Sequence, residues 1–369
     1  MTSRTVYDPL PIDQTPIGQI LEDELAERGW SQADFAVVLG RPAQFVSEIV
    51  TGKKEITRES AAQIGAALGH SPQFWLNLQD QYLLAMQERD AKAQAKLGDV
   101  RRRARLNRLG PIQILQRRGF LTGKTLDDLE REVQELYELD SLDDTPRCEI
   151  AAKRANQGED ITLLQRAWVF CVRREARRRP PVNEYSRSGL DKLAADLPRR
   201  VRTPEDFADL PGRLSNVGVR LVYVEALPSA KIDGCATWVG KHPVVGLSGR
   251  GKRLDKVFFA LLHELAHILH GHVDKDRAIV EDLDDKDESD QEVEANMSGR
   301  NWIFPNGYPP VPTRIIGPWV EKKAAELGIA SIVLIGQLQK SGWLDWRTTL
   351  VKGAPSVADI LPTWNQVRR

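Results

Sequence analysis

Apolar residues recur every three or four positions through the first quarter of the chain, a spacing typical of amphipathic helices. Between residues 17 and 85 the pattern breaks at four short glycine-containing turns, which contain Gly29, Gly40, Gly52 and Gly69. Ser31 is suited to cap the second helix, and Pro42 to occupy the first position of the third. The pattern predicts five short helices, packed as an all-α domain over residues 1–90.

Beyond residue 90 the spacing of apolar residues changes twice along the chain. Residues 91–108 are charged and poor in apolar side chains, and periodic helical segments follow near residues 126–139 and 161–172. After Gly218 the apolar positions alternate over residues 219–224, and short strands are also predicted at 235–239 and 242–247. A long apolar helix follows at 254–270. We therefore predict an α+β protein that is mostly α, with a connector and helical region at 91–205 and a third domain at 206–369.

Composition excludes some classes of protein but does not identify the function. The 369 residues include 41% hydrophobic and 28% charged side chains, with equal numbers of basic and acidic residues. No apolar run approaches the length of a membrane helix, and the N-terminus lacks the apolar run of a secretory signal. Three widely spaced cysteines argue against a disulfide framework and a thiolate zinc cluster. A cytoplasmic protein without a membrane partner is expected.

The second and third predicted helices are separated by a very short turn, the arrangement of a helix-turn-helix motif. The N-terminal residues of the third helix would face base edges, and Gln44 is the best candidate among them because an amide can pair bidentately with adenine. Secondary candidates for DNA contact are Arg41, Ser47, Thr51 and Gln32, with Lys53 and Lys54 placed for phosphate. Residues 1–90 nevertheless carry seven Lys/Arg against thirteen Asp/Glu. A helical bundle used only for dimerisation therefore remains an alternative.

Residues 31–84 contain three distinctive segments: Ser-Gln at the start, Thr-Gly-Lys-Lys after the third helix, and Ser-Pro-Gln-Phe-Trp-Leu-Asn-Leu-Gln. This stretch resembles the XRE-type helix-turn-helix domain of HigA antitoxins. The resemblance covers most of residues 17–85. It implies binding to operator DNA as a homodimer and, in some members, neutralisation of a toxin.

The long apolar helix carries the segment His-Glu-Leu-Ala-His, beginning at His263. A spacing of four places His263 and His267 on one helical face, where both imidazoles can reach one Zn²⁺ ion. Glu264, beside the first histidine, would then act as general base toward a zinc-activated water, the chemistry of peptide hydrolysis. Packed histidines without a metal, or a metal without cleavage, remain alternatives.

A third ligand has to come from elsewhere in the chain. His270 lies about one turn too far along the same helix to join the metal. Glu292 on a following helix is the better candidate, and Asn296, four residues later, would hydrogen-bond a ligand imidazole. Glu294 would point elsewhere. His270, His272 and Tyr308 are open candidates for stabilising the oxyanion.

Several segments of the C-terminal half together resemble the ImmA/IrrE family of metallopeptidases. They are the strand from Gly218, the Gly-Cys-Ala-Thr-Trp segment, the histidine motif, and Glu-Val-Glu-Ala-Asn with the following Asn-Trp-Ile-Phe-Pro. The resemblance covers residues 210–345, and 111–205 more loosely. It implies zinc coordination and cleavage of helix-turn-helix repressors. Met297-Ser298-Gly299 departs from the family, which usually continues with Phe-Ala.

The two halves together predict a DNA-binding regulator with a zinc-dependent endopeptidase domain of zincin-like fold. Its substrate would be a helix-turn-helix repressor or the chain itself. The alternative is a HigA-like antitoxin and autorepressor whose C-terminal domain binds a toxin or a signal without proteolysis.

Overall fold

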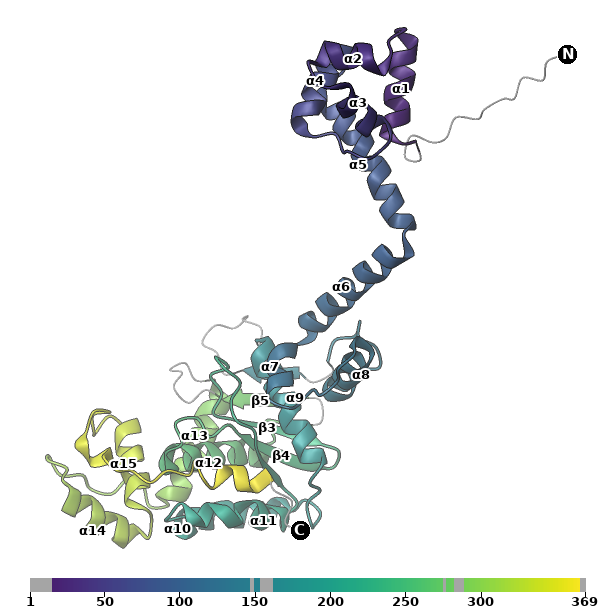
Figure 1. Cartoon of the computed structure of the whole chain (residues 1–369). Helices are drawn as coiled ribbons and strands as arrows, with labels where there is room; N and C mark the ends of the chain where they lie inside the picture. Colours follow the sequence, from purple (N-terminus) through teal and green to yellow (C-terminus); the bar gives the residue numbers. More distant parts are fainter. Residues whose placement is uncertain (1–14, 147–148, 153–161, 275–276, 282–288, 366–369) are drawn as a thin grey trace. The chain divides into compact units, whose positions relative to one another are not determined.

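A computed structural model describes residues 15–146, 149–152, 162–274, 277–281 and 289–365 (Figure 1). The chain divides into two compact units, residues 1–102 and 103–369. The first unit has one apolar core, and the second has two. Among the described residues, no helix combines the length and apolar character needed to cross a membrane.

Five short helices build the first unit, as the sequence predicts. They are α1 (Ile17–Glu27), α2 (Gln32–Leu39), α3 (Ala43–Val50), α4 (Arg58–Leu68) and α5 (Pro72–Arg89), and α6 (Ala91–Leu109) begins in the same unit. The helix ends follow local chemistry. Ser31 and Asp34 form a reciprocal capping box at the start of α2, and Gly40 ends α2 in the left-handed conformation. Phe35, Val46 and Trp75 lie fully buried at the centre of the bundle.

The second unit combines one mixed sheet with helices on both of its faces. Its helices are α7 (Ile112–Arg117), α8 (Leu126–Tyr137), α9 (Leu163–Arg177), α10 (Arg187–Arg200), α11 (Leu210–Ser215), α12 (Leu254–His270), α13 (Asp290–Ile303), α14 (Gly317–Leu327) and α15 (Ser331–Lys340). Short 3-10 helices lie at Glu205–Asp209, Thr349–Val351 and Leu361–Asn365. The mostly helical α+β class expected from the sequence is confirmed at this level.

Five strands in the described residues form the sheet, in the order β1 (Glu149–Ala152), β5 (Arg277–Glu281), β3 (Gly234–Val239), β4 (His242–Leu247) and β2 (Arg220–Tyr223). β3 runs antiparallel to both of its neighbours, whereas β1 pairs parallel with β5 and β2 pairs parallel with β4. Sequence periodicity predicts β2, β3 and β4. The strands β1 and β5 do not emerge from it.

The strands β2, β3 and β4 are largely buried on both faces, and most of their side chains are apolar on both sides. Leu221, Val245 and Ile279 pack in a core with α10, α11 and α12. Val222 and Val244 point the other way, into a second core with α8 and α9. The alternation at residues 219–224 therefore separates two apolar faces rather than an apolar face from a solvated one.

The unit boundary differs from the one expected at residue 205. Helix α9 lies in the region assigned to a separate helical segment, yet it packs directly on β2, β3 and β4. Trp168 of α9 is fully buried, and its indole Nε1–H donates to the backbone carbonyl of Val224, 2.8 Å away. Residues 103–205 and 206–369 consequently belong to one compact unit. A helix that is apolar on the side facing a sheet cannot form an independent domain without exposing that side.

The contact between α9 and the sheet depends on a glycine in β4. A Cβ added at Gly246 would lie 2.6 Å from both methyl groups of Val172 and 3.1 Å from Cys235 Sγ. We expect Gly246→Ala to lower the free energy of unfolding by about 1–3 kcal/mol through overpacking. Urea unfolding of the full chain checks this.

Gly212→Ala in α11 is the matched control, because nothing lies within 4 Å of a Cβ at that position. An alanine there is expected to be neutral or slightly stabilising. Equal stability of the Gly246→Ala and Gly212→Ala variants would contradict the packing of α9 described above.

Candidate functional site

The helix pair α2–α3 has the geometry expected of a DNA-reading element. Gly40 and Pro42 hold the turn between the helices, and Val46 and Ile49 anchor α3 in the core. The opposite face of α3 carries Gln44 and Ser47, both exposed. One face of α3 therefore fixes the helix, while the other presents short polar side chains to solvent.

The remaining candidates for DNA contact surround this face, and several already have intramolecular partners. Thr51, Lys53 and Lys54 are exposed beyond the end of α3. The Thr51 hydroxyl donates to the Ser47 carbonyl over 2.7 Å, which closes the last turn of the helix. Arg41 pairs with Glu59 and donates to Gln63, so it is tied to α4. The Gln32 amide donates to Glu22 over 3.1 Å.

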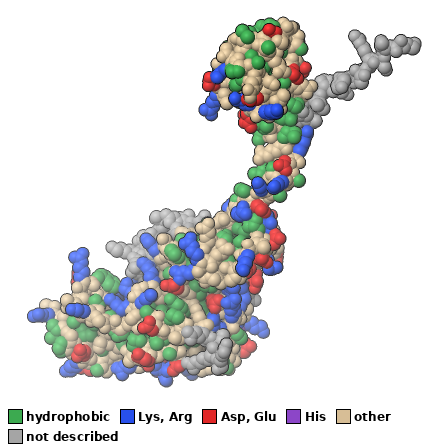
Figure 2. Space-filling view, in the orientation of Figure 1, with side chains coloured by type: hydrophobic (Ala, Val, Ile, Leu, Met, Phe, Trp, Pro, Cys, Tyr) green, Lys and Arg blue, Asp and Glu red, His purple; other side chains and the backbone are tan. Residues whose placement is uncertain are grey.

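Glu48 on α3 would repel phosphate if it stood alone. The Gln44 amide nitrogen donates to Glu48 Oε1 over 2.8 Å, and Lys54 Nζ lies 3.8 Å from Glu48 Oε2. Lys54 also lies over the Phe45 ring, 5.0 Å from its centroid. These contacts balance the carboxylate locally. On the face drawn in Figure 2, basic and acidic side chains of the N-terminal unit are interspersed.

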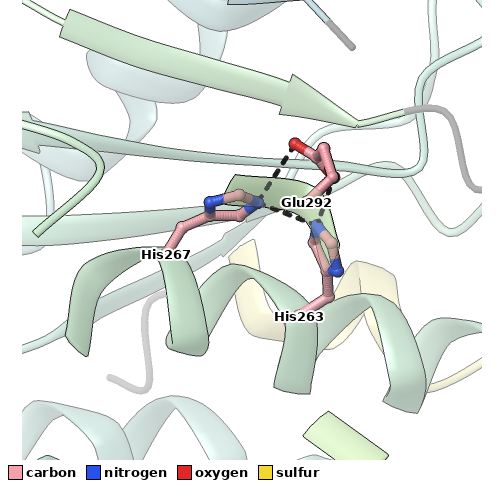
Figure 3. Close-up of side chains that lie close together, drawn as sticks. All are labelled: His263, His267 and Glu292. Atoms are coloured by element: carbon pink, nitrogen blue, oxygen red, sulfur yellow. Dashed lines mark hydrogen bonds and ion pairs between the residues drawn. The ribbon is translucent and has the colours of Figure 1, made fainter. Parts of the chain in front are cut away.

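A polar cluster is buried where α12 packs against α13. Helix α12 is buried along its whole length apart from Lys256 and His270, yet four ionisable side chains lie in that buried stretch: Asp255, His263, Glu264 and His267. Figure 3 shows both imidazoles projecting from successive turns of α12 toward Glu292 of α13. Glu292 lies in the first turn of α13, where the helix dipole favours a carboxylate.

The donor atoms of the three side chains converge on one point. His263 Nε2 lies 3.0 Å from Glu292 Oε2, and His267 Nε2 lies 3.3 Å from Glu292 Oε1. The two imidazole Nε2 atoms are 2.8 Å apart. Two ligands bound to one tetrahedral zinc at about 2.0–2.1 Å are about 3.3 Å from each other. The observed separations therefore fit a single ion of this size.

Two further observations fit the neutral imidazoles that a metal requires. Asn296, one turn beyond Glu292, places its carbonyl Oδ1 3.2 Å from His263 Nδ1. This arrangement puts the His263 proton on Nδ1 and leaves Nε2 as a lone-pair donor. Burial lowers the pKa of His267 to about 4, so this imidazole is uncharged at neutral pH.

Glu264 lies on the same helix and is fully buried. Its carboxylate packs against the first residue of β3, because a Cβ at Gly234 would lie only 2.7 Å from Glu264 Oε1. Glycine at this position gives the carboxylate its space beside the sheet. The sequence offers one signal for it: Gly234 opens the Gly-Cys-Ala-Thr-Trp segment on which the family resemblance rests.

Glu294 and His270 lie outside the group of three ligand atoms, as the sequence predicts. The Glu294 carboxylate points elsewhere, and lies 3.1 Å from His270 Nδ1 and 3.0 Å from His272 Nε2. His270 also contacts Ser298 Oγ at 2.8 Å, beside a 570 Å³ cleft lined in addition by Arg187 and Trp302. Ser298 belongs to the segment that departs from the family pattern, and here it holds a surface histidine.

Comparison with curated proteins identifies the N-terminal unit. Over 72 residues the chain is 36% identical to YddM, an HTH-type transcriptional regulator of Escherichia coli, covering 20% of this chain and 77% of YddM. Over 88 residues it is 32% identical to an HTH-type transcriptional regulator of Haemophilus influenzae, covering 24% of this chain and 82% of the relative. The chain belongs to the helix-turn-helix transcriptional regulators. Both matches lie in its N-terminal region, and no family model matches the chain.

Solved structures similar to this helix-turn-helix regulator cover the same region. One is a Pseudomonas aeruginosa protein in complex with its operator DNA, at 38% identity, 20% of this chain, 80% of that chain and a TM-score of 0.19. Another is an addiction module antidote protein of a HigA family from Coxiella burnetii, at 31% identity, 22% and 90% coverage and a TM-score of 0.21.

Proposed function

We propose that this helix-turn-helix regulator carries a zinc-dependent endopeptidase in its second unit, which cleaves a helix-turn-helix repressor or the chain itself. The observation that carries the proposal is the convergence of His263, His267 and Glu292 at one buried point. The resemblance of residues 210–345 to ImmA/IrrE metallopeptidases supports the same conclusion. Joining the two activities in one chain would let proteolysis change the state of a transcriptional control complex.

In this proposal His263 and His267 bind zinc through Nε2, and Glu292 binds it through its carboxylate. Zinc supplies a Lewis acid that lowers the pKa of water to about 7. Glu264 would serve as the general base toward a water molecule and then as the general acid toward the leaving amine of the peptide. Its buried position against Gly234 keeps the carboxylate away from bulk solvent.

The DNA-binding half of the proposal assigns roles to the residues around α3. Gln44 and Ser47 face base edges, and Gln44 exchanges its bond to Glu48 for a bond to adenine. Lys53, Lys54 and Thr51 contact phosphate, and so does Gln32 at the start of α2. Arg41, in the turn before α3, pairs with Glu59 of α4 and contacts the DNA backbone from that position. A homodimer would place two such helices on an operator with two half-sites.

Zinc uptake is the first test. Purified full-length protein is expected to contain about one zinc per chain by metal analysis. His263→Ala and Glu292→Ala each remove one of three protein ligands, so both variants should lose most of the bound metal. Glu264→Gln removes no ligand and should retain it. A wild-type protein that binds no zinc would sink the peptidase proposal.

Cleavage is a separate test, because a metal can be bound without hydrolysis. The zinc-loaded chain, incubated alone and with helix-turn-helix repressors encoded beside it, is expected to yield discrete fragments on a gel. Glu264→Gln should slow fragment formation by about 10²- to 10⁴-fold through loss of the general base. Full zinc occupancy without cleavage of any such partner would favour the alternative, an antitoxin-like repressor whose second unit binds a toxin or a signal.

Operator recognition gives the third test, with a DNA fragment selected by the wild-type protein from a random pool. Gln44→Ala should lose about 1–3 kcal/mol of discrimination at one base pair, as measured by competition binding. Lys53→Ala should weaken binding to all sequences and lower the salt slope by about one. Gln73→Ala, an exposed glutamine on α5 paired with Asn77, is the matched control and should change neither.

A further inference from the structure

A chain of three side chains leads from the metal cluster to the surface of α13. His267 Nδ1 lies 2.9 Å from His272 Nδ1, and His272 Nε2 lies 3.0 Å from Glu294 Oε2. His267 is fully buried, the His272 side chain is 7% exposed and the Glu294 side chain is 52% exposed. The chain therefore runs from the centre of the unit outward, through one almost completely buried histidine.

The C-terminus of α12 creates this arrangement. Gly271 ends the helix in the left-handed conformation, with φ of 74°. The backbone then folds back, and the His272 amide N–H donates to the His267 carbonyl over 3.0 Å. This reversal places the His272 ring beside the His267 ring, with centroids 5.1 Å apart. Glu294 reaches the pair from α13, the helix that also supplies Glu292.

The chemistry of the last group fixes the direction of every hydrogen bond in the chain. An ionised Glu294 carboxylate can only accept, so His272 donates to it from Nε2. In a neutral imidazole the other nitrogen is then bare, and His272 Nδ1 accepts the proton of His267 Nδ1–H. His267 is left with a lone pair on Nε2, the nitrogen that faces Glu292 and His263.

We propose that His272 and Glu294 are positioning residues that hold His267 in the orientation and tautomer needed to bind a divalent metal. The inference rests on the proposed zinc site and names the outer-sphere groups that complete it. An amide side chain, Asn296, contacts His263 Nδ1, whereas a histidine–carboxylate pair contacts His267 Nδ1. The His272–Glu294 pair also joins the end of α12 to α13, and these two helices provide the three ligands.

Glu294 has a second partner that supplies a built-in control. His270 Nδ1 lies 3.1 Å from the other carboxylate oxygen, and His270 Nε2 contacts Ser298. The His270 ring stacks on the His272 ring, with centroids 5.5 Å apart, but His270 forms no hydrogen bond with His267. It therefore shares the carboxylate and touches His272 without belonging to the hydrogen-bonded path to the metal ligand. Removing His270 tests whether general disturbance around Glu294 is enough to weaken the site.

The experiment measures the zinc dissociation constant of the full chain by competition with a chelator. His272→Ala and Glu294→Ala are each expected to weaken zinc binding by about 10- to 100-fold. The double variant should lose no more than the larger single loss, because both residues act through the same chain of hydrogen bonds. His270→Ala should retain wild-type affinity. His272→Gln, whose amide oxygen can accept from His267 Nδ1–H, should recover part of the loss.

Substitution of cobalt for zinc gives an independent readout, since the visible spectrum of the bound cobalt reports ligand geometry. A changed spectrum in His272→Ala, with a wild-type spectrum in His270→Ala, supports the positioning role. If His272→Ala does not fold, Glu294→Ala carries the test, because that side chain is half exposed. Wild-type zinc affinity in Glu294→Ala, or an equal loss in His270→Ala, overturns the inference. A wild-type chain without zinc affinity overturns the zinc site itself, which is a different result.

Discussion

The second unit depends on the burial of an ionisable cluster inside an otherwise apolar helix. Helix α12 is largely apolar because it lies between the sheet and other helices, yet it buries two histidines and two acidic residues, Asp255 and Glu264. Ionisable groups removed from water raise the free energy of the folded state unless partners compensate them. Here Glu292 and Asn296 come from a single face of α13, so the packing of α12 on α13 and the integrity of the cluster are one and the same condition.

This dependence gives the cluster its chemical meaning. A buried pair of imidazoles with a carboxylate can exist for structure alone. However, when both imidazoles carry their proton on Nδ1, the two facing Nε2 atoms and the carboxylate are all hydrogen-bond acceptors, and none of them can donate to another. A divalent cation at their centre would satisfy all three groups together. The surrounding hydrogen bonds point in the same direction, since those at His263 and His267 both place the proton on Nδ1.

The first unit depends on a different feature, the two contrasting faces of helix α3. Its function needs one exposed and one buried face on α3. Four of the five turns that follow its helices contain a glycine or a proline, which ends one helix or begins the next. Membership of the helix-turn-helix transcriptional regulators rests on this unit.

Local pattern determined most of what the sequence revealed. The i, i+4 spacing of His263 and His267 and the unbroken apolar run fixed α12 at residues 254–270, because helical periodicity and a terminal glycine are properties of neighbouring residues. The five helices of the first unit and the strands β2 to β4 were predictable for the same reason. Glu292 and Asn296 could be proposed as one helical face, although their contact with α12 could not be derived from spacing alone.

Tertiary structure decided what depends on residues far apart in the chain. The strands β1 and β5 are four and five residues long and pair with each other across more than a hundred residues, so neither carries a periodic signal of its own. The boundary expected at residue 205 disappeared because α9 covers the sheet. Glu294 was expected to face away, since residues two apart lie on different sides of a helix. Glu294 does lie outside the group of three ligands, and the backbone reversal at Gly271 brings His272 to meet it, a consequence of packing between two helices that no single segment encodes.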